Sequence, residues 1–143
     1  MIAGLPRQDA AQDEVVEREE VARLAKALYA RKEELEDILR ALQSRSPRLR
    51  EAAHEKLTAI EDPDAASAIE QMFCSQGGNL ALLGIQKLGT MKAYQAAEAL
   101  TWQAVFSPSE PIRTAAATAL RAHRKHDYVP LLLSAMDSPI KSR

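Results

Sequence analysis

The sequence predicts an all-α protein, an α-solenoid of about three helix-pair repeats that follow a long N-terminal helix or helix pair. The composition supports this, because 46% of the 143 residues are hydrophobic and only 4% are aromatic. Such a composition is typical of helical cores rich in Ala and Leu rather than of β-sheets. The second observation is a segment of 31 or 32 residues that occurs three times. A chain of this length can bury about two thirds of its unfolded surface, so we expect a true core.

The N-terminal part is predicted to be a flexible tail followed by helix. Residues 1–12 show no apolar periodicity and contain Pro6, and we expect them to be the tail. From Asp13 to Ser44 there is neither Gly nor Pro, and the apolar residues are spaced by three, four and seven, which predicts helix over 13–44. No capping residue marks the start of a second helix, so one continuous helix is favoured over a pair broken near Arg31.

This helical segment allows two packing arrangements. Val21, Leu28, Leu35 and Leu42 recur every seven residues, as in a coiled coil. Arg31, however, occupies a seam position that coiled coils fill with an apolar residue, and the pattern covers only about three heptads. We therefore expect the helix to pack along the following repeats, with the coiled coil as the alternative.

Residues 45–143 contain the repeats, at about 46–77, 78–108 and 109–137. The segment that begins at Pro47 aligns with the segment that begins at Glu110, and a third copy begins between them at Asn79. Each copy predicts a first helix (about 47–60, 79–89 and 110–123) and a second helix (about 64–74, 92–106 and 127–137). Because no single pair can bury its apolar face alone, stacking of the pairs is expected to build the core. The equivalent positions are Leu49, Leu80 and Ile112; Ala53, Gly84 and Ala116; Leu57, Leu88 and Leu120; and Ile69, Leu100 and Leu132.

Turn residues separate the predicted helices. Asp64 and Asp127 stand where the second helices begin and are expected to cap them. Gly77 and Gly78 are expected to end a helix before an Asn79 cap. The last residues, "SPIKSR", resemble the opening of a repeat, so we expect 138–143 to be a truncated fourth repeat of a longer repeat protein. The preceding helix would then offer an uncapped face for self-association.

The repeats resemble HEAT-like repeats of the short type found in phycobilisome-lyase-related proteins. The resemblance covers residues 46–143 and rests on a Pro near the start of the first helix, an apolar-Arg pair at Leu49-Arg50 and Ile112-Arg113, and an Asp62-Pro63 turn. It implies a right-handed superhelix with the first helices on the convex side and the second helices on the concave side. It also implies a binding surface. The middle repeat departs from the pattern, since Ala81 stands where Arg is expected.

The concave second helices are therefore the predicted contact strip of a non-catalytic scaffold that binds another protein. Trp102 matches Gln71 and Ser134 in the neighbouring repeats, which are polar positions. An exposed Trp there would be an aromatic anchor of the kind that dominates interfaces, whereas a Trp packed in the core is the alternative. The strip consists of Ser67, Gln71, Glu98, Trp102, Pro130 and Ser134.

The sequence offers no catalytic, cofactor or metal site. Cys74 is the only cysteine, and no base lies near it in the chain. His123 and His126 are three residues apart but lack the further ligands that zinc requires. An enzyme or lyase-type activity is the alternative that the resemblance suggests.

Charge argues against nucleic acid and membranes as partners. The net charge is -1 and the isoelectric point is about 6.3, so there is no concentrated positive field. Nucleic-acid binding through basic turns is a further, less favoured alternative. There is no signal-peptide pattern and no run near the ~20 apolar residues of a membrane span, and we expect a cytoplasmic protein. The basic turns contain Arg45, Arg48, Arg50, Arg121, Arg124 and Lys125.

Overall fold

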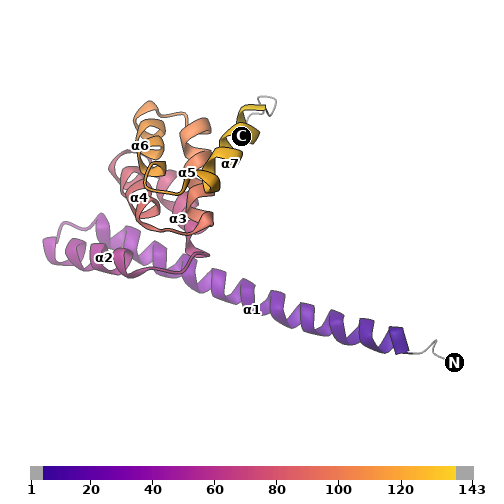
Figure 1. Cartoon of the computed structure of the whole chain (residues 1–143). Coiled ribbons are helices and arrows are strands. Elements are labelled where there is room, and N and C mark those ends of the chain that lie inside the picture. The colour runs from indigo at the N-terminus through magenta and orange to yellow at the C-terminus, as the bar shows by residue number, and fades with distance from the viewer. Residues whose placement is uncertain (1–4, 138–143) are drawn as a thin grey trace. The chain divides into compact units, whose positions relative to one another are not determined.

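A computed structural model describes residues 5–137 of the chain, with side chains from residue 10 onward. Over these residues it contains seven helices and no strand, which confirms the all-α prediction (Figure 1). The predicted fourth repeat at 138–143 lies outside the described residues. The helices are α1 (Leu5–Leu42), α2 (Pro47–Ala59), α3 (Ala65–Cys74), α4 (Gly78–Thr90), α5 (Tyr94–Phe106), α6 (Glu110–Leu120) and α7 (Lys125–Asp137).

Helix α1 is a single helix of 38 residues, as the continuous reading of the sequence predicts. The expected tail is wrong over residues 5–12, because the helix already begins at Leu5. Pro6 falls in the first turn, where a backbone N–H has no helical acceptor, so the missing donor does no harm there. Beyond Pro6 no Gly or Pro interrupts the helix.

The chain divides into two compact units, residues 1–34 and 35–143. The division lies inside α1 rather than after residue 44, because Leu35, Ile38 and Leu39 are buried in the core of the second unit. Over residues 10–30, the apolar side chains of α1 are exposed. The expectation that this stretch packs along the repeats stays a prediction.

The second unit is built from helices that pack in two rows. Helix α5 contacts α3 and α7, and α4 contacts α6, while α3 packs on α4 and α5 packs on α6 (Figure 1). Most positions that the repeat alignment pairs are buried, but Leu49 is 51% exposed, Leu80 and Leu132 are only half-buried, and α7 contains no fully buried residue. The buried equivalents are Ile112; Ala53, Gly84 and Ala116; Leu57, Leu88 and Leu120; and Ile69 and Leu100.

The turns that precede α2 and α6 have the same hydrogen bonds 63 residues apart. Arg50 donates through Nη1 to the carbonyl of Ser44 at 2.8 Å, and Arg113 donates in the same way to the carbonyl of Ser107 at 2.7 Å. In each turn the first Ser hydroxyl also accepts a hydrogen bond from the backbone N–H two residues later. The arginine of the apolar-Arg pair therefore holds the turn that precedes its own helix.

The turn before α4 has no such hydrogen bond from arginine, because Ala81 stands at the position equivalent to Arg50 and Arg113. Gly77 and Gly78 have φ angles of 71° and 55°, in the left-handed region that side chains disfavour. The two glycines end the preceding helix as expected. The cap prediction for Asn79 is wrong, because α4 begins at Gly78 with Gly77 as its N-cap.

The two predicted aspartate caps are also wrong. Asp64 is the N-cap of α3, but its side chain makes no capping hydrogen bond, and its own N–H donates to the carboxylate of Asp62 instead. Asp127 lies inside α7, which begins two residues earlier, and its carboxylate pairs with Arg124 at 3.3 Å. In both segments a side chain of the turn forms the hydrogen bond or ion pair, with Asp62 binding the N–H of Asp64 and Arg124 binding the carboxylate of Asp127.

Two buried polar side chains each bind a backbone carbonyl near the C-terminal end of another helix, α2 in one case and α4 in the other. Lys87 of α4 is 9% exposed and donates through Nζ to the carbonyl of Thr58, in the last turn of α2, at 3.0 Å. His123, buried after α6, places Nε2 3.3 Å from the carbonyl of Leu88, in the last turn of α4. Carbonyls in a last helical turn have spare capacity to accept hydrogen bonds, and these side chains use it; the Leu88 carbonyl also accepts the backbone N–H of Met91. Burial lowers the pKa of Lys87, and Glu61 opposes this shift.

Candidate functional site

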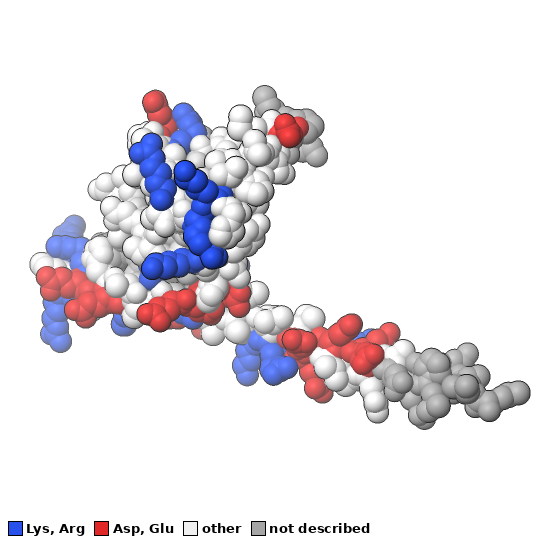
Figure 2. All heavy atoms as spheres, viewed as in Figure 1, with Lys and Arg blue, Asp and Glu red and all other residues white. Residues whose placement is uncertain are grey.

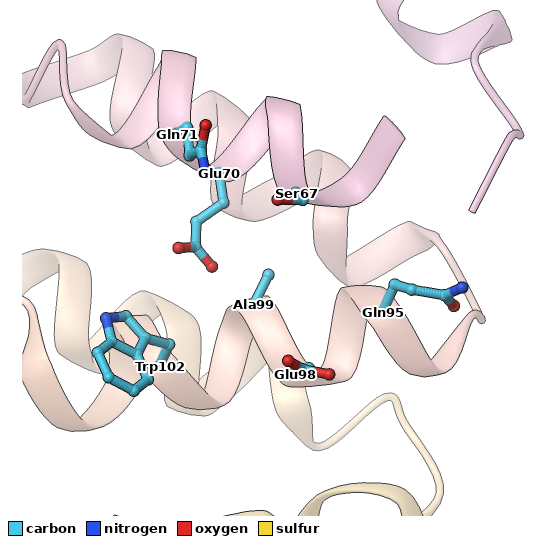
Figure 3. A pocket seen from close by; sticks show the side chains of 7 residues that line it. All are labelled: Ser67, Glu70, Gln71, Gln95, Glu98, Ala99 and Trp102. Carbon is cyan, nitrogen blue, oxygen red and sulfur yellow. The ribbon is translucent and has the colours of Figure 1, made fainter. Parts of the chain in front are cut away.

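The surface between α3 and α5 is hollowed over a volume of about 250 Å³ (Figure 3). Four of the six residues of the predicted contact strip lie around this space, which we call the α3–α5 hollow. Figure 3 shows the Glu70 side chain extending from α3 toward α5. The lining residues are Ser67, Glu70 and Gln71 on α3, and Gln95, Glu98, Ala99 and Trp102 on α5.

Helical periodicity places these side chains together. On each helix the lining residues follow the pattern i, i+3 and i+4, extended on α5 to i+7, and so share one face. The opposite faces are buried, since Ile69 and Phe73 of α3 and Leu100 of α5 are all 0% exposed. The core therefore fixes the rotation of both helices, and the polar faces border the hollow. Ala99 adds only a small buried side chain, which leaves room between the larger groups.

Trp102 is the aromatic group of the hollow, and 36% of its surface is exposed. Its ring centroid lies 4.4 Å from that of Phe106, one helical turn later, with an angle of 42° between the rings. This pairing supports the indole from one side and leaves part of its surface accessible. Trp102 is therefore partly exposed rather than packed wholly in the core.

The hollow is acidic. Glu70 and Glu98 contribute two carboxylates, and none of the lining residues is basic. The remaining polar groups are one hydroxyl and two side-chain amides, which can both donate and accept hydrogen bonds. Burial raises the pKa of the Cys74 thiol to about 12, and the negative charge of Glu70, four residues earlier, adds to this shift. This thiol is therefore not an activated nucleophile.

The structure does not bring the last two predicted strip residues to the hollow. Pro130 and Ser134 are exposed on α7 and are not among its lining residues. Conversely, the sequence did not single out Glu70, Gln95 or Ala99. A helical wheel centred on the strip residues could have found them, because each lies three positions from Ser67, Glu98 or Trp102.

The residues considered for other functions have structural contacts. Arg50 and Arg124, from the two basic clusters, bind the Ser44 carbonyl and the Asp127 carboxylate. Within the described part of the chain, no three His, Cys, Asp or Glu side chains are grouped so that they could hold a metal ion. Over the same residues, no helix has both the length and the apolar character needed to cross a bilayer.

A second hollow, of about 280 Å³, lies between α2 and α4. Its lining includes His54 and Lys87, but the Lys87 amine is already bound to the Thr58 carbonyl.

Comparison with known proteins gives no match. No protein-family model matches the chain, and neither a curated protein nor a solved structure shows significant similarity to it. The resemblance to HEAT-like repeats therefore stays a prediction.

Proposed function

We propose that the chain is a non-catalytic α-solenoid scaffold that binds a segment of another protein in the α3–α5 hollow. The observation that carries this proposal is the hollow itself, which unites a partly exposed Trp with two carboxylates. The scaffold is proposed to consist of HEAT-like repeats over residues 45–137, with α3, α5 and α7 forming the concave side.

Two features of the repeats support the solenoid. The Arg50 and Arg113 turns have the same hydrogen bonds at an offset of 63 residues, about two repeat lengths. Successive second helices contact each other, as do α4 and α6, which is the nearest-neighbour packing that repeat proteins use. A hollow between adjacent second helices is then a natural site for an extended partner segment.

The size of the hollow limits what can bind. Pockets for cofactors and drug-sized ligands measure roughly 300–1,000 Å³, whereas this one is about 250 Å³ and open to solvent. It suits one or two side chains of a larger partner. The carboxylates of Glu70 and Glu98 favour a Lys or Arg, and the exposed indole face of Trp102 can attract the same cation or an apolar neighbour. We therefore propose a partner segment with a basic side chain at its centre.

Selection from a random peptide library displayed on phage tests this proposal with the whole chain as bait. The expected peptides are enriched in Arg or Lys, and their affinity falls as salt is raised, because the site is acidic and partly exposed. A selected peptide is then titrated calorimetrically against the wild type and two variants. Trp102→Ala is expected to raise the Kd at least tenfold, as anchor residues do.

Tyr94→Ala is the matched control. Tyr94 is an aromatic residue of the same helix, 49% exposed, and it does not line the hollow. Its replacement should change the Kd less than about twofold, in the range of contacts outside an anchor. Equal losses in both variants would reject the hollow as the site. A loss in Trp102→Ala that is accompanied by a lower Tm would show instead that Trp102 acts in the core.

A further inference from the structure

Helix α1 carries large apolar side chains that the first unit leaves exposed. Val21, Leu24 and Leu28 lie on one face, and they are 64%, 55% and 50% exposed. Exposed apolar residues that occur singly are ordinary, but a row of them along one helix marks an interaction surface. Most of the stability of a helix in a protein comes from packing of an apolar face, which this row of side chains would supply.

The charges of the same helix are arranged in blocks. Residues 13–20 contain five acidic residues and one basic residue, whereas residues 21–32 contain four basic residues and no acidic one. The blocks therefore have net charges of -4 and +4. Figure 2 shows acidic and basic side chains gathered in separate clusters along α1.

This block pattern distinguishes the two orientations in which two copies of α1 can pair. A parallel pair in register would place the acidic block beside the acidic block and the basic block beside the basic block, which is unfavourable. An antiparallel pair places the acidic block of each copy beside the basic block of the other. The blocks lie next to each other in the sequence, so the pair would be centred near residue 22.

The apolar face selects the same centre. Val21 and Leu24 occupy successive a and d positions of the heptad. In an antiparallel pair, an a position of one helix faces a d position of the other. With Val21 opposite Leu24 of the second copy, Glu14 comes opposite Arg31 of the second copy. Arg31 already binds Glu34 of its own helix at 2.7 Å, but a guanidinium has five N–H donors and can serve both carboxylates. The seam arginine thereby faces a carboxylate of the second copy as well as that of Glu34.

We propose that residues 13–32 of α1 form an antiparallel two-helix coiled coil with a second copy of this chain. The proposal does not depend on the α3–α5 hollow, which belongs to the other compact unit. The pair extends over 20 residues, or about 30 Å. Only Val21 and Leu24 pair with apolar residues in this register, since Leu28 comes opposite Glu17 of the second copy, so the dimer should dissociate on dilution.

The first test is the oligomeric state of the full chain by sedimentation equilibrium over about a hundredfold range of concentration, because a dissociable dimer follows mass action. The expected result is a monomer–dimer equilibrium. Reversing the basic block (Arg23→Glu, Lys26→Glu and Lys32→Glu) should weaken the dimer at least tenfold. Reversing the acidic block (Asp13→Lys, Glu14→Lys and Glu17→Lys) should do the same, and an equimolar mixture of the two variants should dimerise again. A monomer at every concentration would overturn the proposal, and so would wild-type affinity in both reversed variants.

The second test measures orientation and does not require the charge variants to fold. Spin labels are attached to Gln12→Cys, or in the control to Ala22→Cys, with Cys74→Ser in both proteins. In the antiparallel dimer the labels at position 12 are separated by roughly 30 Å along the axis, whereas those at position 22 lie near each other. A parallel dimer brings both pairs within about 10–20 Å, the spacing of neighbouring helices plus the labels. Short distances at position 12 would therefore refute the antiparallel arrangement.

Discussion

Replacement of Gly84 by Ala should destabilise the protein, although Ala is the better helix former. Gly84 lies in the middle of α4, where the helix packs on α3, and an added Cβ would come 2.5 Å from the Cβ of Phe73. Phe73 is 0% exposed. Because the atom in the way is a Cβ, no rotamer change can remove it, and α3 and α4 must separate.

The size of the effect follows from two opposing contributions. Forcing an extra methyl group into a packed core costs about 1–3 kcal/mol, while Ala in place of Gly gains up to about 1 kcal/mol in a helix. We expect a net loss of about 1–2 kcal/mol in the free energy of unfolding, measured by urea denaturation. The Tm should fall by roughly 4–8 °C, as for a domain of about a hundred residues.

Gly89→Ala, in the last turn of the same helix, is the matched control. Its added Cβ would lie 3.1 Å from the Cβ of Ala119, a contact that a small shift relieves. We expect its stability to remain within about 0.5 kcal/mol of the wild type, as for substitutions away from such contacts. If Gly84→Ala were as stable as Gly89→Ala, the close packing of α3 and α4 would be wrong.

Three further predictions concern single side chains. Arg113→Ala should lower the free energy of unfolding by about 1–2 kcal/mol through loss of the hydrogen bond to the Ser107 carbonyl. The control Arg121→Ala, at an exposed position, should change the free energy of unfolding little. Equal effects of the two substitutions in urea denaturation would contradict the role of Arg113 in its turn. Since burial lowers the pKa of Lys87 from 10.5, the unfolded chain binds more protons between the two pKa values, so stability should rise with pH from the lowered pKa up to 10.5. Lys87→Met should show less of this rise, and an unchanged pH profile would refute it. With its pKa raised to about 12, Cys74 should react with iodoacetamide at pH 8 far more slowly in the folded protein than in urea, and equal rates would contradict its burial.

The sequence was sufficient to predict the helices of the repeats, because periodic apolar residues and turn signals agree there. All six repeat helices were expected within three residues of their observed ends. The buried small residues Ala53, Gly84 and Ala116 were likewise predictable from their spacing. The spacing of apolar residues is informative here, because only one face of each helix is buried in the core and that face recurs every 3.6 residues.

Details of the turns were not predictable in the same way. Capping was assigned to Asp64 and Asp127 from residue type alone, yet neighbouring polar groups in the tight turns compete for the same bonds. The Arg50 and Arg113 turns depend on carbonyls six residues earlier, a contact that no helical period reveals. The pattern misplaces the start of α1, because Pro6 and the lack of apolar periodicity predict a tail, although the first turn of a helix accepts proline.

The candidate site was half predictable for a related reason. Equivalent positions in successive repeats identified Ser67, Gln71, Glu98 and Trp102, which do surround one hollow. The same rule also selected Pro130 and Ser134, because a repeat alignment cannot show between which pair of helices the surface is hollowed. That depends on the side chains of both helices, including the acidic Glu70.

The accessibility of Trp102 tests the proposed binding site most directly. It is the only tryptophan of the chain, so acrylamide quenching of its fluorescence reports on the α3–α5 hollow alone. With 36% of its surface exposed, Trp102 should be quenched in the free protein. Saturation with a selected basic peptide should protect it, with the same Kd as the calorimetric titration. A peptide that binds while the quenching of Trp102 stays unchanged would show that the partner binds elsewhere.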